Sequence, residues 1–198
     1  MNITEQESFW EGSFGDDYVD RNINLVRTNH YSKILLNNRI NIRSAIELGA
    51  NVGVNLDALK TLYPDCKTYG VEINKKAYNI LNKNHESYLG SVYNFNTGIK
   101  YELTISSGVL IHQNPDKLND FYSKLYTLSE KYILICEYFS PYPVVVKYRD
   151  NEDKLFKRDF AKEFWVNYPN IELIDYGFFW SKDSHTCGDD LNWFLFKK

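Results

Sequence analysis

Apolar residues along the first two thirds of the chain follow two alternating patterns. Short segments rich in apolar residues predict strands at residues 44–48, 68–73, 101–106 and 132–136, with a further short strand predicted at 87–89. The segment 132–136 is continuously apolar, as expected for a strand buried on both faces. Between the predicted strands, apolar side chains recur every three or four residues, as on one face of a helix. These helical stretches lie at residues 22–38, 52–62, 75–84 and 114–125. Strands that alternate with helices predict a parallel, doubly wound α/β sheet.

The last third of the chain has a different pattern. Residues 144–159 are highly charged, and a helix is predicted around residues 159–168. The apolar runs 171–180 and 191–196 are joined by a polar loop without a helix, which predicts an antiparallel hairpin at the edge of the sheet.

One domain is expected because 198 residues with 43% hydrophobic content can form a single sizeable core. We divide it into four parts, which are an N-terminal lid with helices (1–40), a ligand-binding core (44–139), a substrate-side insertion (140–160) and a C-terminal helix and hairpin (161–198).

Composition excludes several classes of function. A net charge of −3 provides no general attraction for nucleic acid, and no apolar run approaches the length of a membrane span. The polar start is unlike a secretory signal, and three scattered cysteines fit reduced thiols, so we expect a cytoplasmic protein. No histidine or cysteine shows metal-ligand spacing, and no metal site is predicted.

Residues 44–55 form the most informative stretch. A strand, a turn containing Gly49 and Gly53, and the opening of a helix are typical of a nucleotide-binding loop. A dinucleotide loop would need glycines where this chain has Asn51 and Val54. The stretch therefore does not match a pyrophosphate-binding loop.

Two acidic residues indicate a different cofactor. Glu47 would repel a pyrophosphate but suits a ligand with an ammonium group. Glu72, 19 residues after Gly53, ends the next strand, where a carboxylate can accept hydrogen bonds from both hydroxyls of a ribose. The combination fits S-adenosylmethionine better than NAD.

The same residues resemble a known family. Residues 47–53 (Glu-Leu-Gly-Ala-Asn-Val-Gly) are similar to the first motif of class I S-adenosylmethionine-dependent methyltransferases, and Val71-Glu72 to their second motif. Gly90-Ser91-Val92 lies where these enzymes often carry Gly-Asp in contact with adenine, and Ser91 departs from that pattern. The resemblance implies a Rossmann-like, seven-stranded sheet, mostly parallel, with a C-terminal antiparallel hairpin.

Further strings narrow the resemblance. They are the aromatic segment from Phe9 to Asn22, residues 108–115 (Gly-Val-Leu-Ile-His-Gln-Asn-Pro), Glu137-Tyr-Phe139 and residues 152–160. Together they resemble the methyltransferases associated with pseudaminic and legionaminic acid biosynthesis. This implies a small polar acceptor, a nonulosonic acid or a related sugar, methylated at nitrogen or oxygen.

The cofactor-binding residues that we predict share the carboxyl ends of the first strands or the N-terminal lid. They are Tyr18, Arg21, Asn22, Glu47, Gly49, Asn51, Gly53, Asn55, Glu72, Ile73, Ser91, Val92 and Ser107. In this interpretation Arg21 binds the cofactor's carboxylate and Tyr18 covers the sulfonium. A surface helix with a solvated Arg21 is the alternative, and Asn51 and Asn55 could instead cap the helix.

The acceptor side is predicted beyond the fourth and fifth strands. His112 could take a proton from a hydroxyl or ammonium nucleophile, or only hydrogen bond to the substrate or lie beside the Asn114 cap. Glu137 and Tyr138 could line the acceptor pocket, although Glu137 could also pair with Arg149 or Arg158. The charged insertion could hold an anionic sugar through Lys147, Arg149 or Lys154, or be a solvated surface.

Two other functions remain open at this stage. The chain could be a cofactor-binding regulatory subunit without catalysis, or it could methylate tRNA or protein. The acidic charge balance argues against RNA, because neutralising phosphates requires clustered Lys and Arg. The sequence does not predict an oligomeric state.

Overall fold

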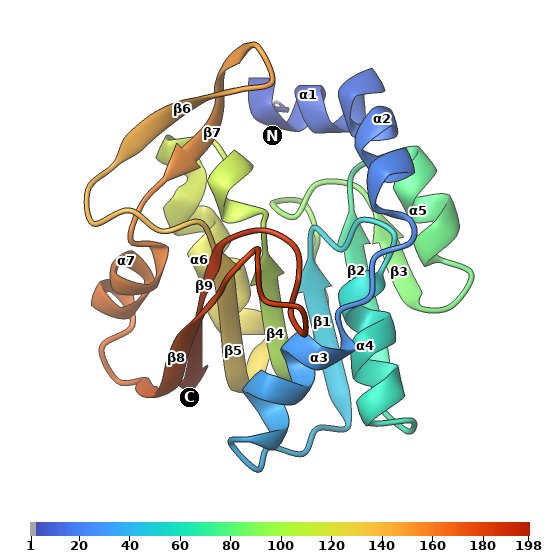
Figure 1. Ribbon diagram of the computed structural model, residues 1–198, viewed down its shortest axis with the longest axis vertical. Coiled ribbons are helices and arrows are strands. Elements are labelled where there is room, and N and C mark those ends of the chain that lie inside the picture. Colours follow the sequence, from blue (N-terminus) through green and yellow to red (C-terminus); the bar gives the residue numbers. More distant parts are fainter. Residues whose placement is uncertain (1–2) are drawn as a thin grey trace.

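The computed structural model describes residues 3–198, which form one seven-stranded sheet with helices on both faces (Figure 1). The sheet order is β3-β2-β1-β4-β5-β9-β8. Its strands are β1 (Ser44–Leu48), β2 (Lys67–Glu72), β3 (Glu86–Leu89), β4 (Tyr101–Ser107), β5 (Ser129–Glu137), β8 (Glu172–Phe179) and β9 (Leu191–Lys197). Only β9 runs antiparallel to its neighbours. The predicted sheet and its antiparallel edge hairpin are confirmed.

Helices cover both faces of this sheet. The helices are α1 (Glu5–Glu11), α2 (Ser13–Asn22), α3 (Thr28–Tyr31), α4 (Val54–Leu62), α5 (Lys75–Leu81), α6 (Leu118–Leu128) and α7 (Phe160–Asn167), with short helical turns η1 (Ser32–Leu36), η2 (Leu110–His112) and η3 (Pro115–Lys117). One core cluster contains Leu35 and Leu59 from the α3–η1 and α4 side, and the other contains Phe121 and Phe164 from α6 and α7. Burial on both faces explains the continuous apolar run at residues 132–136 of β5.

Two predicted elements differ from the structure. The helix expected over residues 22–38 begins at Thr28 and continues as the π-helical turn η1. The charged stretch forms a separate antiparallel hairpin of β6 (Val144–Tyr148) and β7 (Asn151–Lys157). Because many residues of this stretch are charged, its apolar positions did not predict strands. The turn between β6 and β7 places Arg149 and Asp150 at positive φ values of 47° and 67°.

Three segments surround the carboxyl ends of the central strands β1, β4 and β5. They are α1 with α2, the β6–β7 hairpin, and the loop between β8 and β9 (Figure 1). We call residues 5–22, which comprise α1 and α2, the N-terminal lid. In open α/β sheets ligands bind at the carboxyl ends of the strands, which is the region that these segments surround. No helix in residues 3–198 has the length and apolar character needed to cross a bilayer.

Candidate active site

A cavity of about 380 Å³ lies at the carboxyl ends of the parallel strands, beneath the N-terminal lid. Its walls come from the loop after β1, the ends of β2 to β5, the lid, the β6–β7 hairpin and the β8–β9 loop. The volume lies within the range of small-molecule sites.

The loop after β1 forms the floor of this cavity. Gly49 has φ 81°, and a Cβ placed on it would lie 2.6 Å from Cγ2 of Val109. Gly53, with φ 91°, is the N-cap of α4. Both positions therefore require glycine for conformation, and a Cβ would lack space at both, since at Gly53 it would lie 2.8 Å from Cδ1 of Leu81.

Glu47 is buried behind this loop, and one of its oxygens lacks a partner. Its Oε1 accepts a hydrogen bond from Nδ2 of Asn55 at 2.5 Å, while Oε2 has no partner among residues 3–198. Burial raises the pKa of Glu47 to about 8, although the Asn55 bond acts in the opposite direction and nearby Glu72 adds to the rise. A buried carboxyl group with a free oxygen is suited to a cationic ligand.

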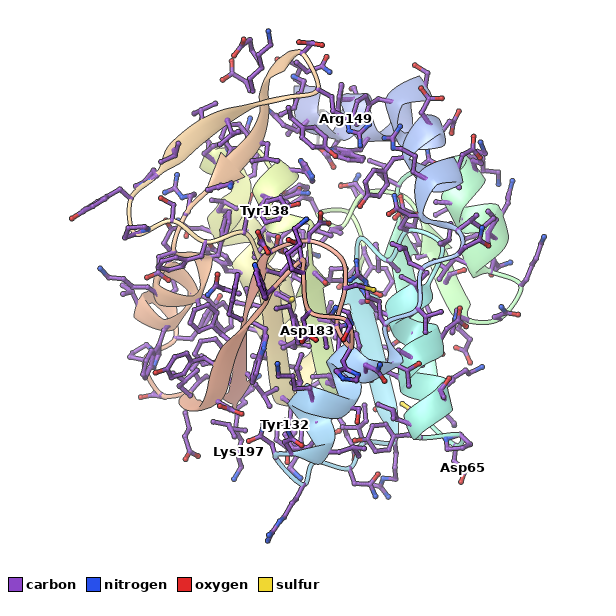
Figure 2. All side chains as sticks on the ribbon, in the orientation of Figure 1. Asp65, Tyr132, Tyr138, Arg149, Asp183 and Lys197 are labelled. Carbon is purple, nitrogen blue, oxygen red and sulfur yellow. The ribbon has the colours of Figure 1, made fainter. Side chains whose placement is uncertain are left out.

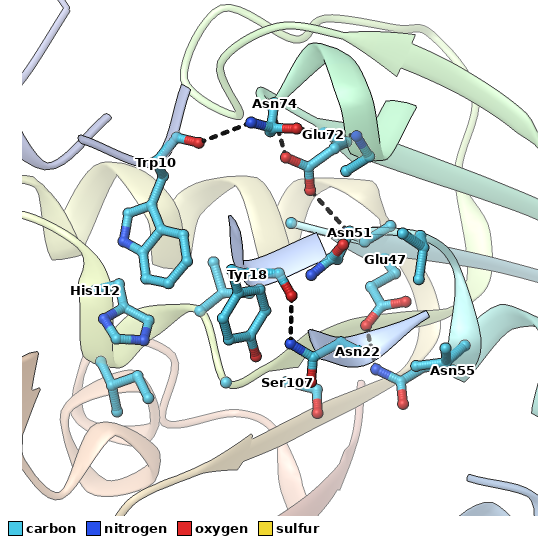
Figure 3. Close-up of a pocket in the computed structure, with 18 of the residues that line it drawn as sticks. Trp10, Tyr18, Asn22, Glu47, Asn51, Asn55, Glu72, Asn74, Ser107 and His112 are labelled. Atoms are coloured by element: carbon cyan, nitrogen blue, oxygen red, sulfur yellow. Dashed lines mark hydrogen bonds between the residues drawn. The ribbon is translucent and has the colours of Figure 1, made fainter. Parts of the chain in front are cut away.

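Glu72 ends β2 on the opposite side of the same loop (Figure 3). Its carboxyl oxygens accept hydrogen bonds at 2.7 Å from the backbone N–H groups of Asn51 and Asn74. Burial raises the pKa of Glu72, and these N–H bonds oppose the rise. The two bonds fix the carboxyl group at the cavity wall, and each oxygen keeps a further lone pair for a ligand hydroxyl.

The N-terminal lid places aromatic side chains on the other side of the cavity. The rings of Trp10 and Tyr18 meet edge to face with centroids 5.2 Å apart. Arg21 lies over the Tyr18 ring at 5.6 Å, and Asn22 donates to the Tyr18 carbonyl at 2.7 Å. Burial raises the pKa of Tyr18 to about 12. All four residues line the cavity, as the predicted cofactor-binding role of Tyr18, Arg21 and Asn22 requires.

His112 lies on η2 between the lid and the hairpin. Its Nδ1–H donates to the carbonyl of Lys154 at 2.6 Å, so the neutral ring carries its lone pair on Nε2. Its ring centroid lies 4.5 Å from Trp10 and 5.1 Å from Tyr148. Burial lowers the pKa of His112 to about 4. The imidazole is therefore neutral at physiological pH and offers a hydrogen-bond acceptor.

The structure contradicts the predicted place of Glu137 in the acceptor pocket. Glu137 is buried away from the cavity and accepts hydrogen bonds from Ser106 Oγ at 2.8 Å and from the N–H groups of Val109 and Leu110 at 3.1 and 3.0 Å. Because side chains alternate along β5, Cys136 and Tyr138 line the cavity instead. Burial raises the pKa of Glu137 to about 7, while its N–H partners lower it. Its position supports the loop that carries His112.

The three basic residues predicted to hold the substrate have different positions. Lys147 is exposed and pairs with Asp150 at 3.5 Å, and Lys154 is buried against Glu5 of the lid. Neither lines the cavity, so the structure corrects these two predictions; both side chains are already paired with carboxylates. Arg149, in the turn of the hairpin and labelled in Figure 2, does line the cavity.

The remaining predicted residues reach the cavity. They are Gly49, Asn51, Asn55, Ile73, Ser91, Val92, Ser107 and Tyr138. Gly53 acts through the backbone as the N-cap of α4. Within residues 3–198, no three His, Cys, Asp or Glu side chains are grouped in a way that could hold a metal ion.

Comparison with solved structures identifies the fold. A 1,6-didemethyltoxoflavin-N1-methyltransferase from Burkholderia thailandensis, with bound 1,6-didemethyltoxoflavin and S-adenosylhomocysteine, matches with a TM-score of 0.73 at 12% identity, over 100% of this chain and 92% of that one. The chain has the class I methyltransferase fold. Magnesium protoporphyrin IX methyltransferase from Synechocystis PCC 6803 with S-adenosylhomocysteine matches with a TM-score of 0.68 at 12% identity, over 98% and 100% of the two chains.

The plantazolicin methyltransferase BpumL, also with S-adenosylhomocysteine, has a TM-score of 0.65 at 14% identity and covers 98% of this chain and 94% of its own. No family model and no curated protein matches by sequence. At these identities the likeness between this chain and known methyltransferases is one of fold.

Several residues of this methyltransferase-fold cavity were not among the predicted site residues. They are Glu7, Trp10, Arg27, Tyr148 and Asp189. The Thr4-x-x-Glu7 spacing of a capping box could have drawn attention to Glu7. Arg27 and Asp189 had no local signal, because tertiary packing alone brings their segments to the cavity.

Proposed function

We propose that this protein is an S-adenosylmethionine-dependent methyltransferase acting on nitrogen or oxygen of a small polar acceptor. The observation that supports this most strongly is the partnerless, buried Oε2 of Glu47 beside the glycine loop, with Glu72 across it. This pair suits a ligand with an ammonium group at one end and ribose hydroxyls at the other.

The cavity residues fit this cofactor group by group. Glu47 would accept from the ammonium, Glu72 from the ribose hydroxyls, and Ile73 and Val92 would pack against the adenine. Arg21 would bind the carboxylate, and Arg27, which also lines the cavity, is a second guanidinium for that role. When bound, S-adenosylmethionine supplies a methyl group on a cationic sulfur, and the aromatic ring of Tyr18 would cover that charge.

The acceptor would lie between Trp10, His112, Tyr138 and Tyr148. In-line methyl displacement depends on alignment, so much of the acceleration is expected from holding the nucleophile at the correct angle. Nε2 of His112 would accept a hydrogen bond from the nucleophilic O–H or N–H and so direct its lone pair. A pKa of about 4 makes His112 a weak base, which favours this orienting role over full proton removal.

We further propose a nonulosonic acid or related sugar as the acceptor. The aromatic wall would pack against the C–H face of a sugar ring, and Arg149 would pair with its carboxylate. The resemblance of the strings at residues 9–22, 108–115, 137–139 and 152–160 supports this choice of acceptor.

Calorimetry and mass spectrometry test the proposal in two steps. S-Adenosylmethionine and S-adenosylhomocysteine should both bind to the purified chain in calorimetric titrations. Incubation with S-adenosylmethionine and a panel of hydroxyl- and amino-bearing small molecules, including nonulosonic acids, should yield a product heavier by one methyl group. Absence of binding would refute the cofactor assignment, and binding without any methylated product across the panel would favour a non-catalytic regulatory subunit.

A further inference from the structure

The adenine end of the cavity contains a carboxylate that the sequence motifs do not assign. The Oγ of Ser91, after β3, donates a hydrogen bond to Oε1 of Glu7 in the N-terminal lid. In the class I methyltransferases that residues 90–92 resemble, an acidic residue often stands in place of Ser91 and contacts adenine. In this chain the acidic group next to that position therefore comes from the lid, 84 residues away in sequence.

The location of Glu7 supports a ligand contact. Glu7 and Ser91 line the main cavity, and they also line a second cavity of about 180 Å³ together with Ile73, Gly90 and Tyr93. The Glu7–Ser91 contact therefore lies at the boundary between the two cavities. An adenine held beyond Glu72 would point its edge at this boundary.

The second carboxylate oxygen of Glu7 caps the first helix of the lid. Oε2 accepts a hydrogen bond at 2.8 Å from the backbone N–H of Thr4, and Thr4 Oγ1 accepts one from the Glu7 N–H at 3.1 Å. This reciprocal capping box starts α1. Glu7 is buried, with 9% of its surface exposed, so any ligand group that meets it does so away from bulk water.

We propose that Glu7 recognises the exocyclic amino group of adenine and thereby makes ordering of the N-terminal lid depend on an adenine-bearing cofactor. This inference rests on the proposed function and deepens it. An amino group donates a hydrogen bond to the carboxylate, whereas the carbonyl oxygen of hypoxanthine at the same ring position would face it as a second acceptor. Because the same carboxylate caps α1, a base that satisfies it stabilises the lid, and a base that repels it does not.

The matched ligands for the test are S-adenosylhomocysteine and its deaminated analogue S-inosylhomocysteine, titrated calorimetrically into the whole chain. The wild type should bind the adenosyl compound at least about tenfold more tightly, the range expected for one hydrogen bond to a charged group. Glu7→Gln keeps the side-chain length and the capping box, which accepts Gln at this position. It should bring the affinity ratio close to one, because an amide can serve either base.

Glu5→Gln is the matched control. Glu5 lies in the same turn of α1, but its side chain is 78% exposed and pairs with Lys154, away from the cavity. This variant should keep the wild-type affinity ratio. The double variant Glu7→Gln/Ser91→Asp returns a carboxylate to the β3 side of the boundary and should restore the preference for the adenosyl compound.

Hydrogen exchange supplies a readout independent of affinity. In the wild type at saturating ligand, S-adenosylhomocysteine should slow exchange across residues 5–22 more than S-inosylhomocysteine does. In Glu7→Gln the two ligands should protect the lid equally.

The outcomes separate this inference from the proposed function. If wild-type protein binds neither ligand, the proposed function fails. If S-adenosylhomocysteine binds but Glu7→Gln retains the wild-type affinity ratio, the cofactor assignment stands and Glu7 does not recognise the adenine amino group. Should Glu7→Gln melt well below the wild type, hydrogen exchange in the wild-type protein decides, and equal protection of residues 5–22 by the two ligands overturns the inference.

Discussion

The two sides of the cavity differ in how their polar and aromatic groups are held. The glycine-loop side (residues 47–55 and Glu72) is held by bonds within the loop after β1 and between this loop and the end of neighbouring β2, such as Asn55 to Glu47 and the Asn51 N–H to Glu72. The aromatic side (Trp10, His112, Tyr138 and Tyr148) is held by contacts among segments far apart in the chain. The first side is therefore preorganised by two adjacent strands of the sheet, and the second exists only when the lid and the hairpin meet the sheet.

This difference implies a division of labour. A change on the glycine-loop side should affect cofactor affinity first, whereas a change on the aromatic side should affect methyl transfer and leave cofactor affinity almost unchanged. Substitutions on the two sides should therefore separate cofactor binding from turnover.

Replacing Glu72 should have the largest effect on cofactor affinity. Glu72→Ala removes the acceptor for two ribose hydroxyls, and we expect an affinity loss for S-adenosylhomocysteine of at least about 100-fold, measured by calorimetry. Glu86→Ala, which removes an exposed carboxylate from neighbouring β3, should leave the affinity unchanged. A folded Glu72→Ala variant with wild-type affinity would show that the ribose lies elsewhere.

Replacing Trp10 tests the aromatic side. Trp10→Ala should lower kcat/KM for the methylated acceptor at least about tenfold, because the wall that aligns the acceptor is lost. Cofactor affinity should change by less than about threefold. The hydrogen bond that ties the lid to Asn74 is made by the backbone carbonyl of Trp10, so it survives the loss of the ring. Trp165→Ala, on the outer helix α7 and 41% exposed, is the control. Equal losses of affinity and turnover in Trp10→Ala would refute the division of labour.

The acceptor-orienting role of His112 predicts a smaller effect. His112→Phe keeps a ring between Trp10 and Tyr148 but lacks Nε2, and we expect kcat/KM to fall about tenfold, as for one lost hydrogen bond. Because burial lowers the pKa of His112 to about 4, its ionisation should leave the rate constant between pH 6 and 9. The control is His185→Ala, which replaces an exposed histidine. The assignment would be contradicted if kcat/KM changed near pH 6.5 in His185→Ala but not in His112→Phe.

Glu47 predicts a pH dependence of cofactor affinity. With a pKa of about 8, its carboxyl group is protonated at pH 7, and a ligand ammonium would lower that pKa and release the proton. Affinity should therefore rise with pH between 6 and 8, by up to about tenfold per pH unit. Calorimetry in buffers of different ionisation enthalpy measures the released proton. Glu47→Gln should abolish both effects, and a wild-type titration without proton release would contradict the assignment.

Local patterns predicted the glycine-loop side of the site but only part of the aromatic side. The spacing of Glu47, Gly49, Gly53 and Glu72 indicated the fold and the glycine-loop side. On the aromatic side, His112 and Tyr138 could be placed because they follow predicted strands, whereas Trp10 and Tyr148 could not. Glu137 was misplaced because alternation along β5 turns it away from the cavity while its neighbour Tyr138 faces it. One residue of register decided the difference.

The lid and hairpin contacts were beyond the reach of sequence patterns. The burial of Lys154 depends on Glu5, 149 residues away, and charged runs are usually solvated surfaces. The ring contacts of Tyr148 with Trp10 and His112 likewise join segments that share no local pattern. Such contacts arise only from the assembled tertiary structure.

A crystal structure of the chain with S-adenosylhomocysteine would locate every group of the ligand. We expect the ammonium within hydrogen-bond distance of Glu47 Oε2, the ribose hydroxyls on Glu72, the adenine amino group beside Glu7 and Ser91, and the sulfur facing Tyr18 and the aromatic side. A ligand bound with its ribose away from Glu72, or its ammonium away from Glu47, would contradict it.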